Sequence, residues 1–146
     1  MSKAILLSIH PEWAEKIYSG EKTIEWRKSY PNDFISTQTK VYLYEPAPVQ
    51  KVTGMFFLES VLFLTTACFE RGISQAHIEN GCVPFEDLKK YKGNSGCLYG
   101  WRVSLPCKRG PFPLTDFGLK LAPQSWQYVE DEMERENKNG HTGNKE

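Results

Sequence analysis

Residues 8–28, SIHPEWAEKIYSGEKTIEWRK, hold a complete strand, helix and strand pattern on which the interpretation of the whole chain depends. Pro11 favours a first helical turn because its missing N–H costs nothing there, and Gly20 favours the left-handed conformation just past a helix end. Together they predict a helix of about two and a half turns over residues 11–19. Trp13 and Ile17 lie four residues apart and form the stripe that packs inward.

The strand after this helix carries a group of charged side chains. Its alternation puts Ile24 and Trp26 on one face and Glu25 and Arg27 on the other. Lys22 lies in the turn at the helix C-terminus, where the helix dipole favours a cation. The three charges therefore converge at one corner of the predicted fold. The alternative is an ordinary solvated face with an exposed ion pair, which stabilises a protein by less than about 1 kcal/mol.

The same stretch resembles the signature of the ASCH domain (activating signal cointegrator homology), a PUA-like β-barrel family. The family pattern Gly-x-Lys-x-x-x-x-Arg falls on Gly20, Lys22 and Arg27. The similarity extends over most of residues 3–129, including PFEDLKKY at 84–91 and PQSW at 123–126. The resemblance implies an α+β fold, a PUA-like pseudobarrel with short helices packed around a cleft near the first helix.

The resemblance also implies a ligand, which is RNA or a molecule of nucleotide size. Recognition of such a ligand needs a cation for the phosphate, a carboxylate or amide for the base edge, and an aromatic ring for stacking. The strand alternation favours a core position for Trp26 over a stacking role. The candidate binding residues are the cations Lys22, Arg27 and Lys28, the acceptor Glu25, and the rings of Trp13 and Tyr44.

An enzymatic function is the alternative. One branch of the ASCH superfamily resembles amidohydrolases of N4-acetylcytidine, which use a Lys, a Thr three residues later and a Glu from a His-Ala-x-x-Glu-Asn segment. Lys22 matches the Lys, and Glu79 in AHIEN at 76–80 matches the Glu as acid or base. Glu25 stands at the nucleophile position, where a carboxylate cannot copy a hydroxyl activated by a lysine. Glu79 has a second interpretation, as one charge on a surface helix.

A non-catalytic protein-interaction module is a third possibility, although no residue pattern specifies a partner. The four cysteines, Cys68, Cys82, Cys97 and Cys107, form no C-x-x-C pair, and the three histidines are widely separated. This spacing argues against a zinc site and indicates reduced, structural thiols. We therefore expect neither a metal nor a cofactor.

Length and charge describe one domain followed by a tail. The chain has 146 residues and zero formal net charge, but residues 130–146 hold six acids and three bases. Residues 1–129 are therefore mildly basic, which permits a phosphate-binding surface. The tail has the composition of a disordered segment. No apolar run reaches the roughly 18 residues of a membrane helix, and no signal peptide is evident, so we expect a cytoplasmic monomer without a membrane partner.

The remaining elements follow from local patterns. Gly54 indicates a bulge, and Glu59 either faces the cleft or points to water. The spacing of Phe85, Leu88 and Tyr91 predicts a core stripe on a helix. Residues 29–39 are predicted to form a loop that suits a flap, Pro106 to end a strand, and Leu121 to lie across the barrel. Further strands are predicted at 3–9, 40–45, 51–64 and 97–105, and helices at 66–71, from 75, and at 83–91.

Overall fold

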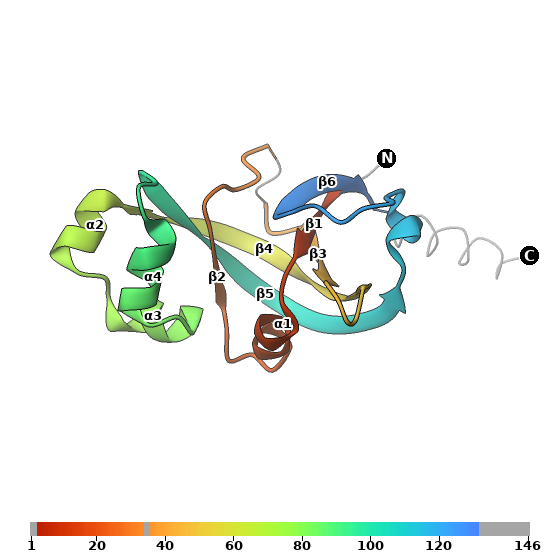
Figure 1. The fold of residues 1–146 in the computed structure, drawn as a ribbon, viewed down its shortest axis with the longest axis horizontal. Coiled ribbons are helices and arrows are strands. Elements are labelled where there is room, and N and C mark those ends of the chain that lie inside the picture. Colours follow the sequence, from red (N-terminus) through yellow and green to blue (C-terminus); the bar gives the residue numbers. More distant parts are fainter. Residues whose placement is uncertain (1–2, 34–35, 132–146) are drawn as a thin grey trace, which may run out of the picture.

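The computed structural model describes residues 3–33 and 36–131, and within them six strands form one mixed sheet with four α-helices and one 3-10 helix around it (Figure 1). The elements in chain order are β1 (Lys3–Ser8), α1 (Pro11–Tyr18), β2 (Ile24–Arg27), β3 (Thr39–Glu45), β4 (Lys51–Thr65), α2 (Thr66–Arg71), α3 (Gln75–Gly81), α4 (Phe85–Lys92), β5 (Cys97–Phe112), η1 (Leu114–Phe117) and β6 (Trp126–Glu130).

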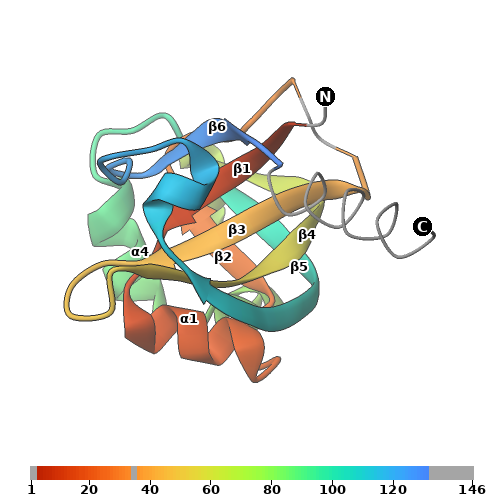
Figure 2. The same cartoon turned by 90° about the vertical axis from the view of Figure 1, so that its right-hand side faces the viewer.

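The strand order is β2-β5-β4-β3-β1-β6, with β1 parallel to β3 and every other pair antiparallel. The sheet curls, so that β6 and β1 lie above β4 and β5 when the molecule is seen from the end (Figure 2). Its edge strands β2 and β6 do not pair with each other. The predicted α+β pseudobarrel is therefore confirmed as a twisted, open sheet rather than a closed barrel.

Alternation along β1 and β3 divides the core into two layers. One layer holds Ile5 and Leu7 of β1 with Ala14 and Ile17 of α1. The other holds Leu6 of β1 with side chains of β3, η1 and β6. Because these two layers pack against opposite faces of β1, both faces are covered, which explains its nearly continuous apolar sequence. The helix α1 begins at Pro11 as predicted, and Gly20 has a φ of 85°.

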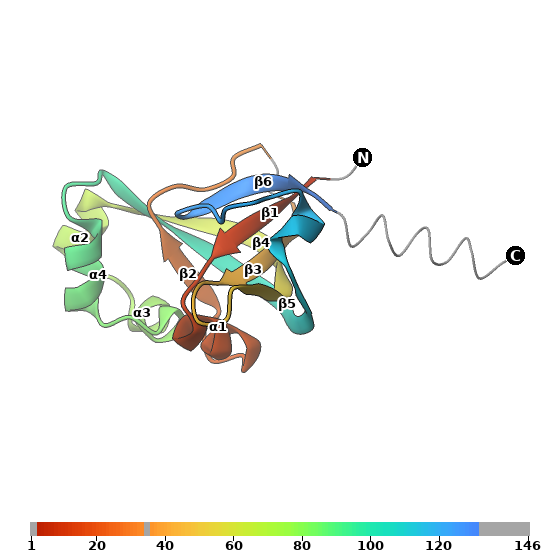
Figure 3. The ribbon, with the colours of Figure 1, turned by 45° about the vertical axis from the view of Figure 1, so that its right-hand side comes forward.

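A third core cluster fixes the helical segment α2–α4 to the sheet. These helices connect β4 to β5, whose ends pair through Thr65 and Cys97, so they extend from the end of a long hairpin (Figure 1). Leu88 of α4 is buried with Ile24 and Trp26 of β2. The helices α1 and α3 consequently approach each other on either side of the turn before β2 (Figure 3).

Three predictions about side chains and strand ends were wrong. The strand β5 does not end at Pro106 but continues to Phe112. Leu105 has a φ of 49°, and the pairing with β4 shifts around it, so Pro106 lies in a bulge where its missing N–H breaks no ladder hydrogen bond. Leu121 is 83% exposed instead of covering the core, and Tyr91 is 41% exposed although Leu88 is buried.

Two predictions fall partly outside the described residues. The loop at 29–39 includes residues 34 and 35, and most of the predicted tail lies in residues 132–146. Asp131 is described and buried, where its carboxylate accepts a hydrogen bond from the Tyr42 hydroxyl at 2.6 Å and pairs with Lys40 at 2.9 Å. No helix among the described residues is long and apolar enough to cross a membrane.

The bulge predicted at Gly54 is confirmed by shifts in its pairing with both neighbouring strands, and it generates a stability test. A Cβ at Gly54 would meet the Cys107 carbonyl and lie 2.6 Å from the Tyr18 hydroxyl. Gly54→Ala should therefore lower the free energy of unfolding by about 1–3 kcal/mol, measured by denaturant titration.

The matched control for this variant is Gly96→Ala. A Cβ at Gly96 meets nothing within 4 Å, so this change should stay within about 0.5 kcal/mol. Equal stabilities for the two variants would contradict the close approach of β4, β5 and α1 at Gly54.

Candidate functional site

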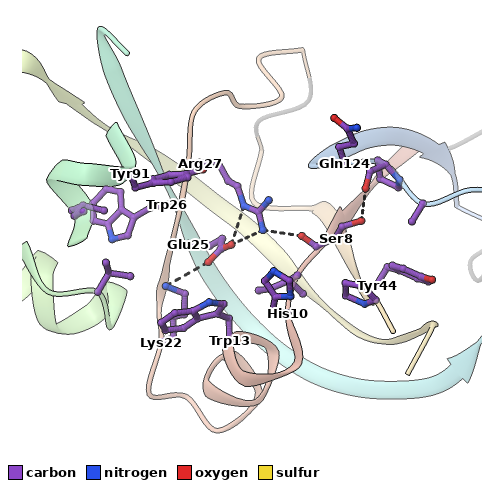
Figure 4. Close-up of a pocket in the computed structure, with 16 residues that line it drawn as sticks. Ser8, His10, Trp13, Lys22, Glu25, Trp26, Arg27, Tyr44, Tyr91 and Gln124 are labelled. Carbon is purple, nitrogen blue, oxygen red and sulfur yellow. Dashed lines mark hydrogen bonds and ion pairs between the residues drawn. The ribbon is translucent and has the colours of Figure 1, made fainter. Parts of the chain in front are cut away.

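A cavity of about 480 Å³ opens between the N-terminal end of α1, the strand β2 and the helix α4 (Figure 4). It is mainly apolar, with a small group of charged side chains from β2 and the turn before it. Its lining residues are Ser8, Ile9, His10, Trp13, Lys22, Glu25, Trp26, Arg27, Tyr44, Pro46, Val83, Leu88, Tyr91, Ala122, Pro123 and Gln124. Segments from both halves of the sequence therefore build one site.

Lys22 is held in the wall of this cavity by contacts from three directions. Its backbone N–H donates to the Lys16 carbonyl, and its ammonium donates to the Gly81 carbonyl. The ammonium also lies 3.4 Å from Glu25 Oε1 and 5.2 Å from the centre of the Trp13 ring. Lys22 is only 2% exposed. Burial lowers its pKa below the ordinary lysine value, and the neighbouring Glu25 partly opposes this effect.

Glu25 bridges two cations. Its Oε1 faces Lys22, and its Oε2 accepts hydrogen bonds from Arg27 Nη2 at 2.7 Å and Nε at 2.9 Å. The carboxylate is 6% exposed, so it depends on these partners in place of water. We call Lys22, Glu25 and Arg27 the charged row. It holds two cations and one carboxylate. The strand alternation predicted Glu25 and Arg27 on one face, and the turn after the helix predicted Lys22 beside them.

Arg27 ties this row to two other parts of the chain. Its Nη2 donates to the Ser8 carbonyl at 2.9 Å, at the end of β1. Its Nη1 donates to Ser125 Oγ at 3.2 Å, just before β6. Most of its N–H groups are therefore used within the protein. The guanidinium fixes β2, β1 and the segment before β6 relative to one another.

Trp26 lines the cavity from the core side. It is 5% exposed and packs against Gly81 and Gly100, which confirms the predicted core position. Its indole Nε1 is buried without a hydrogen-bond partner among the described residues. The Gly81 backbone packs against this side of the ring, because a Cβ added at Gly81 would overlap that nitrogen.

The structure brings most, but not all, of the sequence candidates together. Trp13 and Tyr44 line the cavity with the charged row. Lys28 is exposed and does not line it, although its ammonium lies 5.1 Å from the Tyr91 ring. Glu79 is exposed on α3, where Gln75 Nε2 donates to it at 3.3 Å, and does not line the cavity. Glu59 is also exposed and outside it.

Sequence reasoning did not single out several other side chains of the cavity, among them His10 and Tyr91. His10 lies between the end of β1 and the first turn of α1. This position in a strand-to-helix connection is the sequence signal that could have placed it at the cavity. Tyr91 was assigned to the core because of its spacing. The segments at 84–91 and 123–126, which carried part of the family resemblance, both contribute to the cavity.

Within the described residues, no group of three or more His, Cys, Asp or Glu side chains comes together in a way that could hold a metal ion. All four cysteines are free, and none of them lines the cavity. The polar and aromatic side chains that line the cavity are those of the charged row and of Ser8, His10, Trp13, Trp26, Tyr44, Tyr91 and Gln124.

Comparison with known proteins identifies relatives of the chain. A family model described as the ASCH domain matches residues 7–104. An ASCH domain-containing ribonuclease of Zymomonas mobilis is 35% identical over 60 residues, a match that covers 41% of this chain and 39% of the relative. The chain thus matches about two fifths of the length of that curated relative.

Solved structures from the same organism share the fold. The crystal structure of ASCH from Zymomonas mobilis has a TM-score of 0.73 at 19% identity and covers 90% of this chain and 91% of that one. A crystal structure of a mutant ZmASCH protein has a TM-score of 0.75 at 18% identity and covers 94% of this chain and 98% of that one. At this level of identity the likeness establishes the fold alone.

The environment of Lys22 generates a pH-dependent prediction. Because its pKa is lower in the folded than in the unfolded state, the unfolded chain binds more protons between the two values, and stability rises with pH there. As the pH rises toward 10.5, the free energy of unfolding of the unmodified protein should therefore increase relative to that of a Lys22→Met variant. Denaturant titration over this pH range measures the shift.

A second variant isolates the role of Glu25. Glu25→Gln should lower the Lys22 pKa further, because the charge that favours the ammonium is lost. NMR titration of the lysine side chain reports this pKa directly. The control is Glu21→Gln, which removes an exposed carboxylate from the same turn and should leave the Lys22 pKa unchanged. Equal effects of the two changes would contradict the direct pairing of Lys22 with Glu25.

Proposed function

The chain belongs to the ASCH domain family, and from this premise we propose that its cavity binds RNA by taking up one nucleobase. The observation that carries the proposal is the buried charged row in the wall of a mainly apolar, aromatic cavity. The relative described as a ribonuclease supports RNA as the ligand class.

The size and lining of the cavity support a flat, partly apolar ligand. A volume of about 480 Å³ lies within the ordinary range for small-molecule sites, which are mostly apolar with a few placed polar groups. A nucleobase has the matching character, because it has two apolar faces and one hydrogen-bonding edge. Sequence-specific recognition of RNA uses such splayed bases, which stack on aromatic rings and bond through their edges.

The charged row supplies both kinds of hydrogen bond that a base edge needs. A lysine ammonium has three N–H groups, and Gly81 and Glu25 account for two of those of Lys22. The third makes no hydrogen bond within the described residues, although the Trp13 ring centre lies 5.2 Å from the ammonium, and it is the N–H proposed to donate to an acceptor on the base. Glu25 keeps acceptor capacity beside it, since a carboxylate has about four lone-pair sites. The proposed base edge therefore places an acceptor against Lys22 and a donor against Glu25.

Neutralisation of the Glu25 carboxylate, with one of its acceptor oxygens replaced by an NH2 donor, tests the proposal. Glu25→Gln should weaken binding of a short single-stranded RNA by about tenfold to a hundredfold, the usual value of a hydrogen bond to a charged group. Fluorescence anisotropy of labelled RNA measures the affinity, and circular dichroism verifies the fold. The control Glu21→Gln should bind as the unmodified protein does. Unchanged affinity in a folded Glu25→Gln variant would remove the charged row from the binding site.

Cleavage of RNA is a second candidate, favoured by the presence of His10 in the cavity and by the description of the relative. In this reaction the 2′-oxygen bonds to phosphorus and the P–O5′ bond breaks. A base accepts the 2′-hydroxyl proton, and an acid gives a proton to the 5′-oxygen. An imidazole suits either step near neutral pH. No other histidine among the described residues lines the cavity.

Replacement of His10 tests this candidate. Incubation with 5′-labelled RNA should give fragments that end in a 2′,3′-cyclic phosphate, and His10→Ala should slow their formation by at least about a hundredfold. The control is His77→Ala, which alters a histidine on α3 outside the cavity. If the unmodified protein leaves RNA intact, the cleavage candidate falls and the binding proposal stands.

Deacylation of N4-acetylcytidine and a protein-interaction role stay predictions. Of the three residues that the deacylase hypothesis uses, Lys22 and Glu25 meet in the cavity, whereas Glu79 lies outside it. No surface feature among the described residues specifies a protein partner. Neither alternative has an observation in its favour comparable to the charged row.

A further inference from the structure

Tyr91 is exposed at a position where its sequence spacing predicts a core residue. It lies on α4, whose Leu88 is buried in the core, yet its own side chain is 41% exposed. Among the large apolar side chains that are exposed in the described residues, namely Val49, Phe63, Tyr91, Leu105 and Leu121, Tyr91 is the one that lines the cavity. An exposed ring at the wall of a cavity has its free surface available to a ligand.

Tyr91 reaches toward the charged row. Partial burial raises the pKa of its hydroxyl, with Arg27 opposing and Glu25 adding to the rise, so both charges act on the tyrosine side chain. Outside the cavity, the Lys28 ammonium lies 5.1 Å from the ring centre, within range of a cation–π contact. The ring therefore lines the cavity and also contacts a cation that does not line it.

A second aromatic wall comes from α1. Trp13 lines the cavity and is partly buried against the core. The Lys22 ammonium lies 5.2 Å from its ring centre and the Lys16 ammonium 5.7 Å. In Figure 4, Trp13 and Tyr91 lie on opposite sides of Glu25, and the charged row runs between them.

Both rings are carried by anchored helices. The helix α4 is fixed to β2 through Leu88, Ile24 and Trp26, and α1 is fixed to the sheet through Ala14 and Ile17. Walls on rigid elements are formed before the ligand arrives, which avoids the entropy cost of ordering them.

We propose that Tyr91 and Trp13 form an aromatic clamp that holds one flat nucleobase, with the edge of the base against Lys22 and Glu25. The inference rests on the proposed function. It adds that the spacing of the two rings selects the shape of the ligand, because the clamp accepts a planar ring with two free faces. Lys28, whose ammonium lies beside the Tyr91 ring, then contacts the phosphate next to the stacked base.

The direct test is Tyr91→Leu, which removes the ring, compared with Tyr91→Phe, which keeps it. The probe is a labelled single-stranded RNA of about twelve nucleotides, within the usual range of site sizes. Loss of one stacking contact should weaken binding by about fivefold to a hundredfold in Tyr91→Leu, whereas Tyr91→Phe should bind as the unmodified protein does. The matched control is Phe63→Leu, an aromatic residue of β4 that is 50% exposed outside the cavity and should not affect binding.

A comparison of probes separates stacking from a structural effect of the mutation. The unmodified protein should prefer the RNA over an otherwise identical strand of abasic residues, and this preference should shrink in Tyr91→Leu by the factor that the RNA affinity loses. Affinity for the abasic strand should be equal in the two proteins, since it has no base to stack. A purely structural role would weaken both probes alike and would overturn the clamp.

Failure of the clamp is distinct from failure of the proposed function. If Glu25→Gln weakens RNA binding while Tyr91→Leu and Phe63→Leu both bind normally, the clamp is wrong and the binding proposal survives. If the unmodified protein binds neither the RNA nor any of the four nucleoside monophosphates, both are overturned. If Tyr91→Leu weakens binding, the clamp is supported, and the probes then identify its ligand. Equal affinities for the monophosphates and the RNA indicate a free nucleotide, whereas a higher affinity for the RNA indicates a base within a strand.

Discussion

The pairing of the buried Lys22 ammonium with the Gly81 carbonyl and Glu25 is the interaction on which the site depends. A charge removed from water needs partners with good geometry, and these two come from α3 and β2. The Gly81 backbone lies directly against the Trp26 indole, where a Cβ would overlap the ring, so a residue with a side chain does not fit at this position. The turn after α1, the strand β2 and the helical segment are therefore fixed together by one cation.

Arg27 extends this constraint to the other side of the sheet. Through Glu25, the Ser8 carbonyl and Ser125 Oγ it connects β2 with the end of β1 and the segment before β6. The site is thus also the junction at which distant parts of the chain meet. For this reason a change in binding has a functional meaning only when the fold of the variant is intact, and variants of neighbouring exposed residues serve as controls.

Local periodicity in the sequence predicted which face of a strand each side chain of the site lies on. It did not predict contacts between residues that are far apart in the chain. The alternation of β2 correctly separated Trp26 from Glu25, because strand geometry alone sets the two faces. The contact of Lys22 with Gly81 was not predictable, since a backbone carbonyl 59 residues away carries no side-chain signal. Helical spacing placed Tyr91 in the core, but spacing gives the direction of a side chain and not the extent of the core. Likewise, Pro106 was predicted to end a strand because proline lacks the N–H of a ladder hydrogen bond. The bulge that accommodates it depends on the pairing of β5 with β4, which the local sequence does not reveal.

The proposed function gives the charged row a role in recognition beside its role in the fold. A buried ion pair is often no more stabilising than apolar side chains of similar volume, so a net gain in stability is not by itself a reason for the charged row, although the row fixes the elements that it joins. In a mainly apolar cavity, however, the same groups form stronger hydrogen bonds to a ligand than they would on an open surface. Lys22 retains a donor and Glu25 retains acceptor sites, both fixed before any ligand arrives. A row of this kind between two aromatic rings matches the two faces and one polar edge of a nucleobase.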